Sequence, residues 1–302
     1  MAATAAEFQD LLEPKYSNIW HDSWPKYPSK YSEVFNIRSM EKNTITDTEN
    51  AGFGSLQTQT DGAEVTFDDP IRGNDVEYTY IVRALAYKIH ERLWRNDLYD
   101  EVDKFEKDLM DSSADDIETS AAVIFNNAFA TTYNTGFDGL ALCSTAHTRL
   151  DGGTNQQNNP STDEALSVSA LHNAYTTILK WKNHRGRPRM FTPKTLLIPP
   201  DLANTAYEIL DSQLHPENAN NTKNIIVNRY GLAEPIIWNY LTSTTAWFML
   251  CTEHDLNFFW KFRPETGMET EWKTDSINRK VRQGYVVGFG KWEGVYGTDG
   301  VA

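Results

Sequence analysis

Apolar residues recur every three to five positions between residues 84 and 110, a spacing typical of an amphipathic helix. They are Leu85, Ile89, Leu93, Leu98, Val102, Phe105 and Leu109. The opposite face is strongly acidic, and we interpret it as solvated, with a paired face between copies of the chain as the alternative. A Ser-Ser pair followed by acidic residues then predicts a second helix that ends near residue 131.

Strict alternation of apolar and polar residues predicts strands before and after this helical region. Residues 45–83 alternate around the turn sequences DG and RGN, which is typical of a β-hairpin. The apolar side chains of residues 52–80 are too few and too scattered to form a core of their own, so we expect this hairpin to pack on a neighbouring copy. After Pro235, a series of apolar or alternating runs predicts antiparallel strands.

The intervening segment alternates between helical and strand patterns. Its predicted elements, in order, are a helix at 163–186 that Gly186 stops, a strand at 194–200, a short helix at 201–212 and a strand at 224–231. These patterns together predict a mixed α/β, or α+β, chain without internal repeats.

The first 44 residues are rich in aromatic residues and proline and show no sustained period, so we interpret them as an extended arm. Such an arm cannot bury Trp20, Trp24 and Tyr27 by itself. The whole chain holds 9 Trp, 14 Tyr and 14 Phe, an aromatic content expected of a protein with extensive interfaces.

Charge and cysteine content exclude several classes of protein. A net charge of −14 argues against general affinity for nucleic acid, because that affinity comes from Lys and Arg. The two cysteines, Cys143 and Cys251, lie in no metal-binding spacing and suit free thiols in a reducing compartment. The chain opens on no basic and apolar leader, and its apolar runs are far shorter than the ~20 residues of a membrane helix, so we expect no membrane partner.

Candidate catalytic residues are few, and each has an ordinary structural interpretation. Cys143 and His147 lie four positions apart in the stretch DGLALCSTAHTRLDGGTNQQNNPST, residues 138–162, but no third group stands nearby. We interpret them as a half-buried thiol and a loop histidine. Glu269 and Glu271 imitate the carboxylate pair of a glycosidase, yet their spacing is also that of a solvent-facing strand. We therefore expect no catalytic residues, no metal and no cofactor.

A basic cluster at residues 180–189 includes Arg185 and Arg187. Because the overall charge is negative, we favour a turn surface or a salt-bridge patch between copies of the chain over a phosphate site.

The order of these elements resembles that of the major capsid protein of tailed phages, and in particular the Mu-like major head subunit group. Four stretches are similar to that group, namely the DGLALCSTAHTRLDGGTNQQNN loop, TLLIPPDLANTAYEIL, the pair NRYGLAEPIIWNYL and AWFML, and the closing GYVVGFGKWEGVYG. In such proteins the first of these stretches is a structural loop, so Cys143 and His147 need no reaction to explain them.

The resemblance implies a division of the chain into four parts. They are an N-terminal arm at 1–44, an extended β-hairpin loop at 45–83, a peripheral domain with a long spine helix at 84–163 and 258–302, and an axial domain at 164–257. It also implies a structural subunit of the virion rather than an enzyme, which assembles in the host bacterial cytoplasm into hexamers and pentamers of an icosahedral head around double-stranded DNA. A separate scaffolding protein, a portal and decoration proteins are the further partners it implies.

Eight residues are the predicted contacts between subunits, chosen from the arm, the hairpin and the basic cluster. They are Trp20, Trp24, Tyr27, Phe53, Phe67, Tyr78, Arg185 and Arg187. Two other functions stay open at this point, which are another virion component, such as a tail or decoration protein, and a carbohydrate-acting hydrolase.

Overall fold

The computed structural model of the chain describes Trp20 and most residues from 29 to 300. The described ranges are 29–62, 64–90, 92–93, 101–133, 135–212, 214, 223–226, 230–232, 234–271 and 273–300. The chain divides into two compact units. The first comprises Met1–Ile45, Thr79–Ala121 and Phe258–Val287, and the second comprises Thr46–Tyr78, Ala122–Asn257 and Gly288–Ala302.

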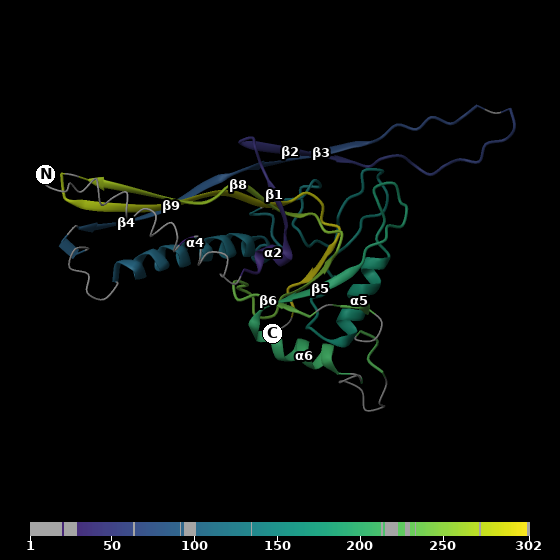
Figure 1. The fold of residues 1–302 in the computed structure, drawn as a ribbon. Coiled ribbons are helices and arrows are strands. Elements are labelled where there is room, and N and C mark those ends of the chain that lie inside the picture. The colour runs from purple at the N-terminus through teal and green to yellow at the C-terminus, as the bar shows by residue number, and fades with distance from the viewer. Residues whose placement is uncertain are drawn as a thin grey trace. The chain divides into compact units, whose positions relative to one another are not determined.

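The first unit contains a four-stranded sheet with strand order β1-β8-β9-β4 and the long helix α4 (Figure 1). Its strands are β1 (Asn36–Ser39), β4 (Ile81–His90), β8 (Leu256–Glu271) and β9 (Ser276–Phe289), and its helices are α2 (Tyr31–Val34) and α4 (Glu101–Asn126). Polar contacts join α4 to β9, because Ser113 Oγ donates to Gln283 Oε1 at 2.8 Å and Tyr285 Oη donates to Ser120 Oγ at 2.9 Å.

The predicted helix at residues 84–110 is wrong for its first part and correct for its last, because α4 begins at Glu101. Residues 81–90 form strand β4, which pairs antiparallel with β9 from Ile81–Tyr285 to His90–Ser276. The spacing from Leu85 to Ile89 fits a strand as well as a helix, and the β-branched and aromatic residues around it favour pairing with β9.

The two helices that the pattern predicts are in fact one, α4. Ser112 does not cap a second helix, because its Oγ donates to the Asp108 carbonyl one turn earlier, at 2.9 Å.

The acidic face of α4 is not wholly solvated. Glu106 is completely buried, and its Oε1 lies 2.5 Å from Nη2 of Arg279 on β9. The Tyr87 hydroxyl donates to Glu106 Oε2 at 2.8 Å. A buried ion pair with this many hydrogen bonds costs about 3–5 kcal/mol when one partner is removed, so it holds α4 in one register on the sheet.

The second unit is built on a four-stranded sheet with strand order β10-β7-β5-β6. Its elements are α5 (Val168–Leu179), β5 (Pro193–Ile198), the 3-10 turn η2 (Pro200–Leu202), α6 (Ala203–Asp211), β6 (Ile236–Ile237), β7 (Trp247–Cys251) and β10 (Val295–Thr298). All five residues of β7 are buried, as the uninterrupted apolar run AWFMLC predicts. β7 pairs antiparallel with β5 and β10, whereas β5 and β6 are parallel.

Two predictions for this unit need correction. Helix α5 ends at Leu179 rather than at Gly186, which instead occupies a turn with φ 74° between the bridged residues Lys182 and Pro188. The predicted strand at 224–231 is also wrong for its described part, because Ile225 and Ile226 are helical. Ile226 is buried in the main core of this unit, so its apolar character reflects burial and not a strand.

The strands of the predicted hairpin at 52–80 pair only at the end farthest from its turn. Strands β2 (Thr44–Asn50) and β3 (Arg72–Thr79) form a two-stranded sheet, and the described residues from 51 to 71 contain no strand. Figure 1 shows these residues as a long loop that continues beyond the two strands. We call residues 51–71 the β2–β3 loop. Its glycines and polar residues have no apolar face to stabilise a ladder.

Most of the predicted N-terminal arm, including Trp24 and Tyr27, lies outside the described residues. Residues 29–44 are integrated into the first unit. Tyr31 packs against Phe258 with ring centroids 4.8 Å apart, and the Met40 amide donates to the Trp260 carbonyl at 2.8 Å.

Candidate functional site

The stretch DGLALCSTAHTRLDGGTNQQNNPST, which we call the network loop (residues 138–162), is irregular but contains a buried polar network. His147 and Asn158 have no exposed surface, although both are polar. Backbone hydrogen bonds of 2.8 Å in both directions between His147 and Gln156 close this part of the loop. Because buried polar groups are costly without partners, the contacts of these two side chains decide the conformation of the loop.

Asn158 is the centre of this network. Its Oδ1 accepts from the Ser144 amide at 2.8 Å, and its Nδ2 donates to the carbonyls of Leu142 at 2.7 Å and Val295 at 2.9 Å. The orientation of the amide is therefore determined, since a flipped amide would face two acceptors with its oxygen. The Asn158 side chain therefore connects residues 142–144 of the network loop with strand β10.

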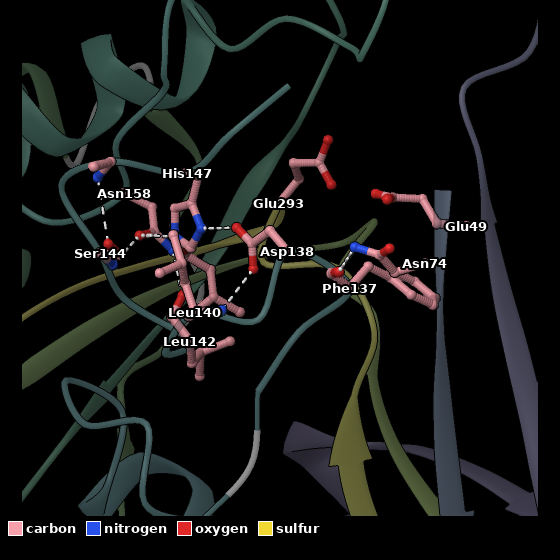
Figure 2. A network of polar contacts seen from close by, with 12 residues as sticks. Glu49, Asn74, Phe137, Asp138, Leu140, Leu142, Ser144, His147, Asn158 and Glu293 are labelled. Atoms are coloured by element: carbon pink, nitrogen blue, oxygen red, sulfur yellow. Dashed lines mark hydrogen bonds and ion pairs between the residues drawn. The ribbon is translucent and has the colours of Figure 1, made fainter. Parts of the chain in front are cut away.

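His147 lies between Asp138 and Asn158, as Figure 2 shows. Its Nδ1 is 2.6 Å from Asp138 Oδ2, and its Nε2 is 2.9 Å from Asn158 Oδ1. The ring stacks on Trp292 with centroids 4.3 Å apart and an interplanar angle of 6°. Both ring nitrogens lie within hydrogen-bond distance of a side-chain oxygen, so the ring is held on both sides.

The interpretation of Cys143 as a half-buried thiol is wrong, because its side chain is buried, with an exposure of 2%. His147 lies in a loop, as predicted, but it has no exposed surface. Burial raises the pKa of the Cys143 thiol, which keeps it protonated and unreactive. No group of three His, Cys, Asp or Glu side chains among the described residues is arranged to hold a metal ion. The network loop is therefore built for rigidity. Asn158 is not among the residues predicted from the sequence, because its role depends on contacts that form only when the loop is folded.

The β2–β3 loop has the opposite character. Large apolar side chains on it face solvent, with exposures of 59% for Phe53, 63% for Val65 and 94% for Phe67. Leu56 is fully exposed as well. A cluster of exposed large apolar residues on one segment is a typical feature of an interaction site.

The basic residues at 182–188 hold the base of the β2–β3 loop within the same chain. Arg185 donates to the Gly52 carbonyl at 3.3 Å through Nε and also to the Asp69 carbonyl, and Arg187 Nη2 donates to the Phe53 carbonyl at 2.8 Å. Their predicted role between subunits stays a prediction, but these contacts give them a role in their own chain.

The remaining predicted contact residues have mixed environments. Trp20 is buried in a small cluster with Leu109, Met110 and Val281, and Tyr78 is 2% exposed. Both are packed inside their own chain. Phe53 and Phe67 are thus the described aromatic residues of this set that stay available to a second molecule.

Glu269 and Glu271 do not have the properties of a glycosidase pair. Glu271 forms an ion pair with Lys88, and hydrogen bonds from Lys88 and Thr274 lower the pKa of Glu271. A general acid of this class needs a raised pKa, so the change has the wrong sign for that role.

Comparison with known proteins identifies the family. The model of the phage capsid protein family matches residues 75–298. The chain therefore belongs to the phage capsid protein family, and it is a structural subunit of the phage head and a virion component. The Mu-like group within this family stays a prediction. A search of curated proteins finds no match.

Solved phage structures have the same fold, which confirms the predicted fold class. A chain of Microbacterium phage Oxtober96 is 11% identical, with a TM-score of 0.57 over 90% of this chain and 91% of that chain. The capsid structure of the Cyanophage P-SCSP1u gives 9% identity and a TM-score of 0.59 over 89% and 87%. A capsid of bacteriophage JBD30 decorated with minor capsid protein trimers gives 13% identity and a TM-score of 0.54 over 72% and 92%.

Proposed function

We propose that copies of this chain assemble into hexamers and pentamers of an icosahedral head that encloses double-stranded DNA. The observation that carries this proposal is the β2–β3 loop, which exposes Phe53, Leu56, Val65 and Phe67 while arginines hold its base. Burying a Leu or Phe side chain contributes about 1.5–3 kcal/mol, so the contact with a neighbouring subunit that covers this loop would be strongly stabilised.

The division into functional parts is also part of the proposal. The arm is residues 1–44, the extended loop is 45–83, the peripheral domain is 84–163 with 258–302, and the axial domain is 164–257. The whole axial part lies within the second compact unit. Structural work of this kind needs no catalysis, in keeping with the buried thiol of Cys143 and the paired Glu271.

The proposed enclosure of DNA does not depend on binding by the subunit. With a net charge of −14, the free subunit lacks the excess of Lys and Arg that phosphate binding needs. Packaging would then be driven through a portal by a separate motor. A scaffolding protein during assembly in the host cytoplasm is a further proposed partner. The decorated JBD30 capsid supports decoration proteins as another. Among the described residues, no helix could span a membrane.

The test replaces residues 55–67 with a short Gly-Ser linker, which leaves the arginine contacts at residues 52, 53 and 69 in place. We expect a free energy of unfolding within about 0.5 kcal/mol of the unaltered protein, because the loop packs on little of its own chain. Closed shells should be absent from negative-stain images. The matched control is Thr60→Ser, an exposed change in the same loop that should assemble normally. Normal shells from the shortened chain, or an unfolded chain, would contradict the proposal.

A further inference from the structure

Three ionisable side chains meet where the β2–β3 ladder adjoins the β2–β3 loop, and their hydrogen-bonding capacity is not fully used. Their exposed fractions are only 4% for Glu49 of β2, 9% for His184 in the turn of residues 182–188 and 3% for Glu293 in the segment before β10. Nε2 of His184 lies 2.8 Å from Glu49 Oε1 and 3.9 Å from Glu293 Oε1. Figure 2 shows the carboxyl groups of Glu49 and Glu293 directed toward each other.

The hydrogen bonding of this cluster is incomplete. Nε2 of His184 and Oε2 of Glu293 are buried and have no hydrogen-bond partner of good geometry among the described residues. The contact of His184 with Glu49 is therefore an ion pair whose direction is poor for a hydrogen bond. Its Nδ1 accepts from the Leu150 amide at 3.4 Å, a weak bond whose loss on protonation costs little.

We propose that Glu49, His184 and Glu293 form a proton-controlled anchor, which holds the base of the β2–β3 ladder on the turn of residues 182–188 at low pH and loosens as the pH rises. The packing makes the anchor specific to this ladder. The Glu49 side chain lies over Gly73 of β3, where an added Cβ would come within 2.9 Å of the Glu49 Cβ. Any movement of Glu49 therefore disturbs the pairing of β2 with β3.

The charges that surround the cluster set the sign of the effect. Burial disfavours charged His184, but Glu49 and Glu293 outweigh burial and raise the pKa of His184 above its ordinary value despite Lys291. Burial also raises the pKa of Glu293, in spite of His184, Arg189 and Lys291. Both groups thus bind protons more strongly in the folded state.

The pH window follows from these two directions. A raised pKa contributes stability that is fully present below the unfolded value and is lost as the pH rises through the folded value. The unfolded value is about 4.3 for a Glu and about 6.5 for a His. The anchor therefore weakens from the mildly acidic range upward. Above the folded pKa of His184, the ring is neutral and its attraction to the carboxyl groups beside it is lost.

The contacts of Arg185 and Arg187 with loop carbonyls do not titrate in this range, so the loop stays tethered at residues 52, 53 and 69. The loosening is confined to the ladder, Thr44–Asn50 and Arg72–Thr79. Because the anchor lies within one chain, it does not depend on the proposed assembly into heads.

The experiment is hydrogen–deuterium exchange of the unassembled full chain between about pH 6 and about pH 8.5, corrected for intrinsic rates with the denatured chain. We expect the protection of ladder amides to fall with rising pH. The fall should be about tenfold for each unit by which the pKa of a titrating group in the folded state exceeds its value in the unfolded state. Glu293→Gln removes one of the two titrating groups and should reduce this fall. Glu64→Gln, an exposed change in the β2–β3 loop, is the control and should leave the fall unchanged.

Constant protection of the ladder across this range would overturn the proposal, and so would an undiminished fall in Glu293→Gln. A second measurement needs no variant that might unfold. The imidazole of His184 in the unaltered chain, followed by NMR, should titrate above the ordinary value of about 6.5. Titration at or below that value also overturns the proposal.

Discussion

The network loop and the β2–β3 loop are similar in composition but differ in which side chains they bury. Both are long, irregular, rich in glycine and polar residues, and free of regular elements over most of their length. In the network loop the polar side chains of His147 and Asn158 are completely buried. In the β2–β3 loop the apolar side chains of Phe67 and Leu56 are exposed.

This contrast separates structural residues from functional ones. A buried polar side chain with all its partners in one chain contributes to the rigidity of that chain. Exposed apolar side chains contribute nothing to their own chain and gain stability only when a second molecule covers them. The network loop thus supports the fold, and the β2–β3 loop is the part that we propose acts between molecules.

The largest expected difference between the two loops is in thiol reactivity. A cysteine introduced by Ser55→Cys, at an exposed position of the β2–β3 loop, should be alkylated as fast as a free thiol. Cys143 of the network loop should react at least about a thousandfold more slowly, because reaction requires the core to open. Mass spectrometry of peptides after a time course with iodoacetamide measures both rates. Similar rates for the two thiols would contradict the difference in burial between the two loops.

The next effect is in stability. Asn158→Ala removes the partners of the part-buried Ser144 amide, of the buried His147 Nε2 and of two carbonyls, and should cost about 3–5 kcal/mol of the free energy of unfolding. Urea denaturation followed by tryptophan fluorescence measures this loss. Asn155→Ala, in the same loop but exposed, is the matched control and should change the value by less than about 0.5 kcal/mol. Equal losses from both variants would mean that the network contributes nothing.

The smallest expected effect on the subunit comes from the β2–β3 loop. Phe67→Ser should change the free energy of unfolding by less than about 0.5 kcal/mol, since the ring is 94% exposed. The concentration at which shells form should nevertheless rise by at least about tenfold, because an interface that buries a Phe loses more than 1.4 kcal/mol. Light scattering over a dilution series gives this concentration. A destabilised subunit with unchanged assembly would reverse the proposed roles of the loops.

Local sequence patterns predicted part of the first unit and failed where two patterns coincide. Residues 85–89 satisfy both helical and strand spacing, and pairing with β9 decides for the strand β4. The serines at 112–113 look like a helix start, but their hydroxyls bond within α4 and to Gln283, so the helix continues. Neither outcome is visible without the partner strand.

The sequence by itself determined the mixed fold, the buried strand β7 and the short helix α6, because these depend on apolar runs and on residue types close together in the chain. It also predicted a loop at residues 45–83 that lacks a core. Only the tertiary structure decided the position of the ladder, the burial of Glu106 and the meeting of Glu49, His184 and Glu293. These features join residues far apart in sequence, and the free energy of a buried polar group depends on partners that local patterns do not specify.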